Sequence, residues 1–330
     1  MASNQNQMKQ VNTSKQRGRG YLLWLGRILV AALGLIVIGA VYESVAEASD
    51  VRAYPPPGQM VDVGGYRLHI NCTGTGSPTV VIDAGLGDWS TIWGPVQTGV
   101  AKATRVCIYD RAGMGWSEPG PMPRDAQHLA NELHTLLHNA NIPGPYVMVG
   151  HSMGGLPIRV FVHNYSSEVA GVVLIESMSP KQFTQSSVDA QSQSESLSRP
   201  FSIPALLARF GIVRLLAKPL GLVTSVPSDE KAYFALSVRP QSIQALTDEM
   251  QGMPASGAQA AAVRSFGDMP LIVLTARLDN NPPNWQVWQT ELLQLSSNSQ
   301  QLFAESGHNI EIEQPDAAGA AIVKMIEQIR

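Results

Sequence analysis

The sequence predicts an α/β fold in which a mostly parallel sheet is covered by helices on both faces. Two observations lead to this prediction. Short apolar runs rich in β-branched residues recur along the chain, and segments of helical period separate them. Strands that alternate with helices pair in parallel, because each helix returns the chain to the same edge of the sheet. The 330 residues, 44% hydrophobic and 15% charged, are enough to build the core of one large domain.

The N-terminal part of the chain has a different organisation. Residues 1–20 are polar and basic, whereas residues 21–42 are apolar except for Arg27. A helix over 21–42 would rise about 33 Å at about 1.5 Å per residue, enough to span a bilayer. Basic flanks remain on the cytoplasmic side of a membrane. We therefore expect a cytoplasmic tail at 1–20, a transmembrane anchor at 21–42, and the rest of the chain outside the cytoplasm.

A cleaved signal peptide is the alternative for this segment. The uninterrupted apolar run from Ile28 to Tyr42 has the length of a signal-peptide core, and Ala46–Ala48 offers small residues for cleavage. Cleavage would leave a secreted or periplasmic protein. Residues 43–59 are expected to form a linker that ends in the extended segment Pro55–Gly58. The folded domain is then expected over 60–330.

Strand and helix patterns follow one another through this domain. Gly64–Gly65 indicates a hairpin between the first two strands, and the later strands are apolar throughout, as in sheets buried on both faces. The predicted strands are Met60–Val63, Tyr66–Asn71, Thr79–Asp83, Arg105–Tyr109, Tyr146–Val149, Ala170–Ile175, Pro270–Thr275 and Gln301–Ala304. The predicted helices are Ala126–Asn139, Met153–Tyr165, Trp285–Leu295 and Ala317–Ile329.

One long interval interrupts this alternation. Between Ile175 and Pro270 there is no strong strand pattern, and several segments have helical character. Helices inserted between two strands of a sheet cover the carboxyl ends of the strands, where the sites of α/β proteins lie. We expect a helical cap over about 178–265. Its apolar residues are expected to pack on the cap itself and on the sheet, and contact with a membrane surface is the alternative.

A serine motif lies at the junction of a predicted strand and a predicted helix. Gly150–Gly154 reads G-x-S-x-G, with Ser152 at its centre. A serine at the tip of so tight a turn has a strained backbone, and glycines on both sides leave room for it. The helix that follows directs its free N–H groups toward the serine, where they stabilise a developing oxyanion. The motif therefore predicts a nucleophilic Ser152.

Two further motifs occur in a consistent order with this one. Tyr109–Ser117 follows a predicted strand, and Ser306–His308 is followed by Glu313–Asp316 after the last strand. Together with Gly150–Gly155, they resemble the α/β-hydrolase superfamily, specifically its capped serine esterase-like members, from about Val61 to the C-terminus. The resemblance implies an eight-stranded, mostly parallel sheet flanked by helices, with a helical cap inserted after the sixth strand.

The resemblance also implies roles for individual residues. In the family order of serine, acid and histidine, Ser152 is the nucleophile, Asp279 the acid and His308 the base. Glu176, just beyond the preceding strand, is the rival for the acid, since some relatives carry the acid there. The oxyanion hole would consist of the backbone N–H groups of Met153 and Leu86. This chain has Ala84-Gly85 where many relatives have His-Gly, which leaves the support of the Leu86 loop open.

These residues predict a serine hydrolase of the carboxylesterase or lipase type. It would cleave a small-molecule carboxylic ester, with an apolar acyl or alcohol group, through an acyl-enzyme intermediate. The chemistry requires no metal or organic cofactor. An acyltransferase or amidase would use the same triad, and a non-catalytic hydrolase-like binding protein is the alternative of another class.

Charge and cysteine content complete the sequence picture. The formal net charge is −3 and no basic face or run is apparent past residue 27, which argues against a nucleic-acid partner. The two cysteines, Cys72 and Cys107, lie on strands that are neighbours in the family's sheet. A disulfide is compatible with export, but we expect two buried thiols.

Overall fold

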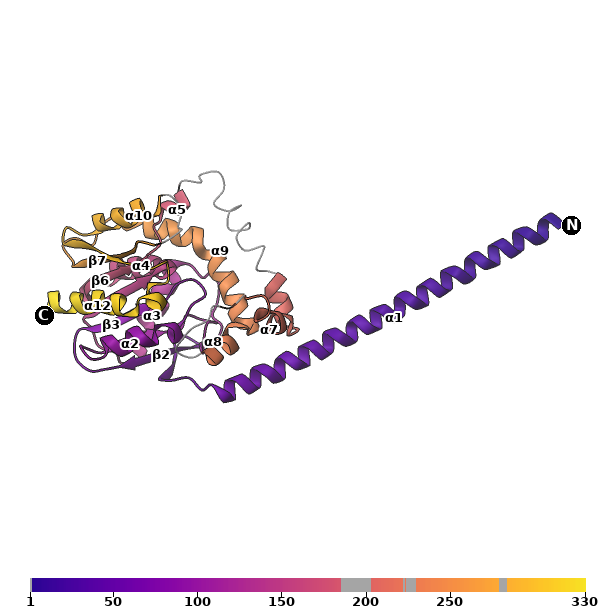
Figure 1. The fold of residues 1–330 in the computed structure, drawn as a ribbon, viewed down its shortest axis with the longest axis horizontal. Helices are drawn as coiled ribbons and strands as arrows, with labels where there is room; N and C mark the ends of the chain where they lie inside the picture. Colours follow the sequence, from indigo (N-terminus) through magenta and orange to yellow (C-terminus); the bar gives the residue numbers. More distant parts are fainter. Residues whose placement is uncertain (1, 185–202, 222, 224–229, 279–283) are drawn as a thin grey trace.

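An eight-stranded sheet in the order β1-β2-β4-β3-β5-β6-β7-β8 forms the centre of the protein (Figure 1). The computed structural model describes residues 2–184, 203–221, 223, 230–278 and 284–330. Strand β2 runs antiparallel to β1 and β4, and all other neighbours pair in parallel, so the predicted sheet is confirmed. The strands are β1 (Gln59–Asp62), β2 (Arg67–Thr73), β3 (Thr79–Asp83), β4 (Val106–Tyr109), β5 (Tyr146–His151), β6 (Val169–Ile175), β7 (Leu271–Ala276) and β8 (Ser299–Ala304).

Helices cover both faces of this sheet, because side chains alternate between the two faces along each buried strand. On β3, Val80 and Ile82 join one core with α2 and α12, whereas Val81 joins the other core with α3 and α4. The helices on the sheet are α2 (Gly94–Val100), α3 (Ala126–Asn139), α4 (Gly155–Asn164), α10 (Trp285–Leu292) and α12 (Pro315–Ile329). Shorter helical turns are η1 (Ser90–Trp93), η2 (Ser152–Gly154), η3 (Ser166–Glu168), η4 (Leu293–Leu295) and α11 (Ile310–Glu313).

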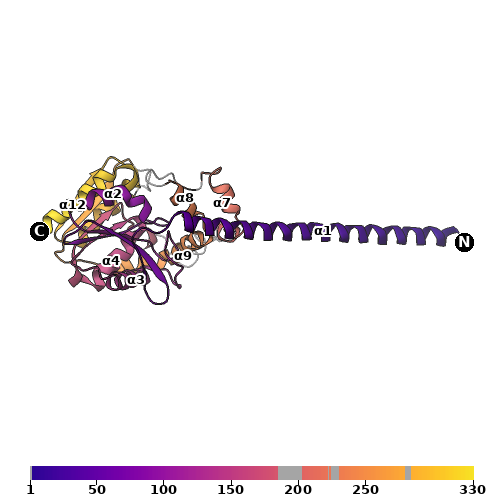
Figure 2. The same ribbon diagram turned by 90° about the horizontal axis from the view of Figure 1, so that it is seen from below.

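A helical cap is inserted between β6 and β7, as predicted. Its described helices include α5 (Lys181–Thr184), α7 (Ile212–Ala217), α8 (Glu230–Ser237) and α9 (Pro240–Ala262), and residues 203–208 are helical as well. Helix α9 is the longest of these and contacts α3, α4 and α5. Helices α7 and α8 lie at the side of the domain where the N-terminal helix departs (Figures 1 and 2).

The N-terminal helix α1 (Ala2–Ala53) extends away from the domain as one continuous rod (Figure 1). From Leu23 to Tyr42 its apolar side chains are mostly exposed. This length corresponds to about 30 Å of helix, the thickness of a bilayer core. The part from Leu23 to Ala53 is long and apolar enough to cross a membrane, by length and composition.

The segment expected to be a linker is largely helical and is attached to the cap. Glu43 accepts a two-pronged ion pair from Arg214, with distances of 2.9 Å to Nε and 2.7 Å to Nη2. The same guanidinium reaches Asp50 at 2.6 Å, and Arg239 pairs with Glu47 at 2.9 Å. The three acids recur at helical spacing and face the cap together. This helical segment therefore replaces the expected linker up to Ala53.

The segment between α1 and β1 is also held to the domain, by hydrogen bonds to its backbone carbonyls. The indole Nε1 of Trp116 donates to the carbonyl of Tyr54 at 2.8 Å, and the imidazole of His69 contacts the carbonyl of Pro57. The other ring nitrogen of His69 lies 2.9 Å from Asp110. Both nitrogens of this buried ring thus face acceptors, and although burial favours the neutral ring, Asp110 raises the pKa of His69.

The two cysteines form a disulfide, which corrects the expectation of free thiols. Cys72 on β2 and Cys107 on β4 lie directly opposite each other in the antiparallel pair, with an S–S distance of 2.05 Å. In an antiparallel pair of strands, side chains come closest together at directly opposed residues whose backbones are not hydrogen-bonded to each other. The sequence placed both residues on neighbouring strands, but it did not place them opposite one another, and that register decides the pairing.

Candidate active site

Ser152 occupies a strained turn between β5 and α4. Its φ angle is +49°, in the left-handed region that side chains other than glycine rarely adopt. Both glycines of the motif are required because backbone atoms of neighbouring segments lie where a Cβ atom would stand. A Cβ on Gly150 would lie 2.7 Å from the Cα of Gly155, and a Cβ on Gly154 would lie 2.5 Å from the carbonyl oxygens of Asp83 and Ala84. The turn therefore matches the strand–turn–helix context that the motif requires.

His308 reaches this serine from the loop after β8. Its Nε2 lies 2.9 Å from Ser152 Oγ, within hydrogen-bond distance. Glu313 holds this loop in place. Its carboxylate accepts hydrogen bonds from the backbone N–H of Gly307 at 2.7 Å and from the hydroxyl of Ser306 at 3.2 Å. The structure thus brings together two of the predicted site residues, which are 156 positions apart in the chain.

The two candidates for the acid differ in what the structure describes. Asp279 lies outside the described residues. Glu176, at the end of β6, is fully buried, and its carboxylate accepts from the backbone N–H of Ala276 at 2.7 Å and from Trp285 Nε1. The Trp285 ring in turn stands edge-on to His308, with ring centroids 5.6 Å apart. Glu176 therefore supports the wall against which His308 packs.

Arg111 braces the loop after β3, which carries the predicted oxyanion donor Leu86. Its buried guanidinium donates to the carbonyls of Ala84 at 2.7 Å and Gly85 at 2.6 Å. It also donates to Asp83 at 2.7 Å and, through Nε, to Glu249 of cap helix α9 at 2.6 Å. Arg111 supplies the support that the sequence left open. The adjacent Asp110 has other partners, because it accepts from His69 and from two backbone N–H groups.

The predicted oxyanion residues lie close together. Met153 is buried in a small apolar cluster with Leu129 and Met253, and Leu86 packs against the same cluster. A pocket of about 210 Å³ adjoins this loop and is lined by residues of the loop and of α8 and α9, among them Leu86, Tyr233 and Leu246. Space for a ligand group therefore lies between the loop and the cap.

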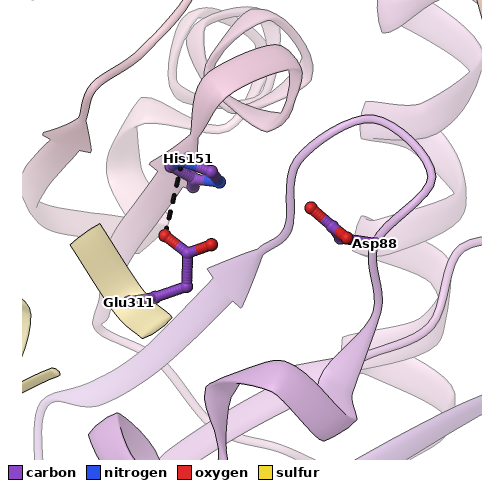
Figure 3. Close-up of side chains that lie close together, drawn as sticks. All are labelled: Asp88, His151 and Glu311. Atoms are coloured by element: carbon purple, nitrogen blue, oxygen red, sulfur yellow. Dashed lines mark ion pairs between the residues drawn. The ribbon is translucent and has the colours of Figure 1, made fainter. Parts of the chain in front are cut away.

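A buried polar cluster beneath these loops was not found by sequence reasoning. Asp88, His151 and Glu311 each offer a ligand or hydrogen-bonding atom, and these atoms all lie within 4.8 Å of one another (Figure 3). Burial raises the pKa of Glu311 to about 8. Burial, and then the charge of Glu311, raise the pKa of Asp88 to about 6. No motif links these three residues in sequence, since Asp88 follows β3, His151 is the last residue of β5 and Glu311 lies in α11.

The comparisons with known proteins can be set against this geometry. The α/β hydrolase fold family matches residues 78–315. The chain belongs to this family. A curated relative, named "Probable transporter efuK" from Hormonema carpetanum, is 33% identical over 125 residues, which cover 36% of this chain and 18% of that protein. The chain spans less than half the length of the curated relatives that it matches.

Solved structures agree with the family assignment. An esterase from Thermogutta terrifontis aligns with a TM-score of 0.63 and 22% identity, covering 82% of this chain and 98% of that one. The epoxide hydrolase CorEH aligns with a TM-score of 0.62 and 18% identity, covering 82% of this chain and 99% of that one. At these identities the likeness establishes the α/β hydrolase fold alone, so the reaction must be argued from the residues of the site.

Proposed function

We propose that this α/β hydrolase is a serine hydrolase that cleaves carboxylic esters through an acyl-enzyme intermediate. The contact of 2.9 Å between Ser152 Oγ and His308 Nε2 is the observation that carries the proposal. His308 takes the proton as Oγ attacks the ester carbonyl, and the backbone N–H groups of Met153 and Leu86 stabilise the oxyanion. His308 then protonates the leaving alcohol, and water that it activates releases the acid.

Asp279 is the acid in this proposal. Its role is to hold the imidazole in the tautomer that accepts the serine proton and to stabilise the imidazolium that forms. Its position beyond β7 and the engagement of the Glu176 carboxylate with Ala276 and Trp285 support this choice. An acyltransferase or amidase would form the same acyl-enzyme and differ in the acceptor or in the bond that is broken.

A fluorophosphonate probe, together with a chromogenic ester, tests the proposal. The probe should label the wild-type chain at Ser152, and Ser152→Ala should abolish labelling and lower ester turnover by several orders of magnitude without loss of folding. Labelling without ester turnover would favour an acyltransferase or amidase. Absence of labelling in a folded wild-type chain would favour a binding protein and refute the proposed chemistry.

We also propose that α1 anchors the enzyme in a membrane with the catalytic domain outside the cytoplasm. Its exposed apolar stretch leads into the segment that contacts the cap, where a Cβ on Gly39 would lie 2.5 Å from the carbonyl oxygen of Phe210 and where Glu43 pairs with Arg214. Leu215 of the cap, which lines a groove together with Tyr42 of α1, is also exposed. Disulfides persist in oxidising compartments, so the bond between Cys72 and Cys107 supports export. Protease added outside the cytoplasmic membrane should digest the domain, whereas protection of the domain would refute export.

The cap suggests a substrate with an apolar group that arrives from the membrane side. A groove of about 590 Å³ lies between α1 and the cap. It is lined by Tyr42, Leu215 and Phe234, and also by the charged residues Asp50, Arg214, Lys218 and Lys231. Val223 lines both this groove and the pocket beside Leu86. The two spaces therefore lie on either side of Val223, and we propose that an acyl chain passes this residue on its way from the membrane side to the oxyanion loop.

A further inference from the structure

The cluster of Asp88, His151 and Glu311 has a charge arrangement that its surroundings leave unbalanced. The Glu311 carboxyl group is buried and the Asp88 carboxyl group is partly buried, and within the described residues no lysine or arginine bonds to either one, whereas the imidazole of His151 lies 3.4 Å from Glu311. Arg111, whose charge acts on Asp88, is already paired with Asp83 and Glu249. Two carboxylates this close together in such surroundings are costly without a cation, so the cluster requires either protons or a cation.

The geometry of the imidazole favours a cation. His151 Nε2 lies 3.1 Å from the carbonyl oxygen of His308, an acceptor only, so Nε2 carries the proton and donates it. The lone pair is then on Nδ1, which is buried and has no hydrogen-bond partner. A proton-sharing chain would need a donor at Nδ1. A metal-binding histidine shows the observed pattern, with one nitrogen free and the other donating to a carbonyl.

The free atoms point into a common space. A Cβ on Gly85 would lie 3.0 Å from His151 Nδ1 and 3.1 Å from Asp88 Oδ2, so the missing side chain of Gly85 leaves both atoms accessible to a small ion. Tyr233 donates to Asp88 Oδ1 at 3.3 Å, which leaves Oδ2 for the ion. Both carboxylate oxygens of Glu311 are buried without a hydrogen-bond partner. In Figure 3 the Glu311 carboxylate lies next to His151, and Asp88 lies across from this pair.

We propose that Asp88, His151 and Glu311 bind a divalent metal ion of the Zn²⁺ type. An imidazole nitrogen with two carboxylate oxygens suits Zn²⁺ better than Mg²⁺ or Ca²⁺, which take oxygen ligands. Zn²⁺ bonds of about 2.0–2.2 Å allow ligand atoms at most about 4.4 Å apart. One ligand atom of each residue lies within 4.8 Å of the other two, and Glu311 Oε2 approaches the imidazole at 3.4 Å on its Nε2 side, so side-chain shifts, mainly of Glu311, close the set around Nδ1.

Such an ion would tie together the three segments that carry the proposed catalytic groups. Asp88 follows the oxyanion loop, His151 precedes Ser152, and Glu311 lies in α11 just after His308. The ion would fix the relative positions of these segments from below and would take no part in the ester chemistry. The metal site therefore stands on its own geometry and does not depend on the proposed reaction.

Titration with Co²⁺, a spectroscopic substitute for Zn²⁺, tests the site. The full chain is purified in detergent, treated with a chelator and titrated with cobalt chloride. We expect saturable binding of one Co²⁺ per chain with visible d–d absorption, which Zn²⁺ abolishes by displacement. Added Zn²⁺ should also raise the Tm, because the ion binds the folded state.

Two variants and one matched control decide the assignment. Glu311→Gln and Asp88→Asn keep side-chain size but remove a ligand charge, and each should lose the stoichiometric Co²⁺ spectrum and the Tm shift. Glu168→Gln is the control, because Glu168 forms an exposed pair with His134 at 3.0 Å, and it should bind as the wild type does. If Glu311→Gln does not fold, which a missing cooperative melt would reveal, Asp88→Asn decides. Absence of saturable binding to the wild type, or one Co²⁺ retained in both variants, would overturn the metal site and leave a protonated cluster.

Discussion

Replacing Arg111 with lysine tests how the oxyanion loop is positioned. The guanidinium makes five hydrogen bonds, to Asp83 at 2.7 Å, Ala84 at 2.7 Å, Gly85 at 2.6 Å, and Glu249 at 2.6 and 3.1 Å. A lysine ammonium keeps the charge but has only three donors in a compact head. At least two acceptors lose their partner. At about 1–3 kcal/mol for each unsatisfied buried group, Arg111→Lys should lower the free energy of unfolding by about 2–6 kcal/mol.

The same change should reduce catalysis beyond its effect on stability. If the loop shifts, the Leu86 N–H no longer meets the oxyanion, and loss of one such donor costs about 10²–10³ in kcat. We expect kcat of the folded variant on a chromogenic ester to fall by up to this factor, with KM little changed. The assay is run well below the Tm of the variant, which is measured first by thermal melting.

Arg124→Lys serves as the control for loss of a buried guanidinium. Arg124 is buried to a similar degree but pairs with Glu132, away from Ser152. This variant should keep kcat close to the wild-type value. If Arg111→Lys retains wild-type kcat while its stability falls, Arg111 stabilises the fold without positioning the oxyanion donor, and the reasoning is refuted.

Three further predictions follow from the site and its surroundings. Asp279→Asn should lower kcat by about 10³–10⁴-fold through loss of imidazole orientation, and Glu176→Gln far less; the reverse ranking in steady-state assays would reassign the acid. The pKa of His69 is raised in the folded state, so the stability that its protonated ring contributes is complete below the ordinary histidine pKa and is lost as the pH rises through the folded-state pKa. The free energy of unfolding, measured at several pH values, should show this loss in the wild type and not in Asp110→Asn. Val223→Trp should reduce turnover of long-chain esters more than of acetate esters, and an equal effect on both would exclude the route along the cap.

Sequence patterns predicted the parts of the fold that depend on local periodicity and local turns. The central strands are apolar throughout because both their faces are buried, and a pattern of this kind is visible in any short window. Ser152 was predicted because a tight turn imposes glycines at fixed spacing. His308 followed from its position after the last strand, since family order places the base there.

Contacts between distant segments could not be predicted in this way. The partner of Glu43 is Arg214, 171 positions away, so residues 43–53 read as a polar linker. Arg111 meets Glu249 across 138 positions, and its neighbour Asp110 was the nearer candidate in sequence. In each case a charged side chain has many conceivable partners, and only the packed fold selects one.

The attachment of α1 to the cap also sets how the enzyme meets its substrates. With α1 as the proposed anchor, the ion pairs of Arg214 and Arg239 prevent the domain from rotating relative to α1, as a flexible linker would allow it to do. The groove beside α1 is then held at a constant height and angle above the lipid surface. Encounters with a lipid-soluble ester become a two-dimensional search within one leaflet. Turnover should accordingly follow the surface density of such a substrate in the bilayer and vary little with its bulk concentration.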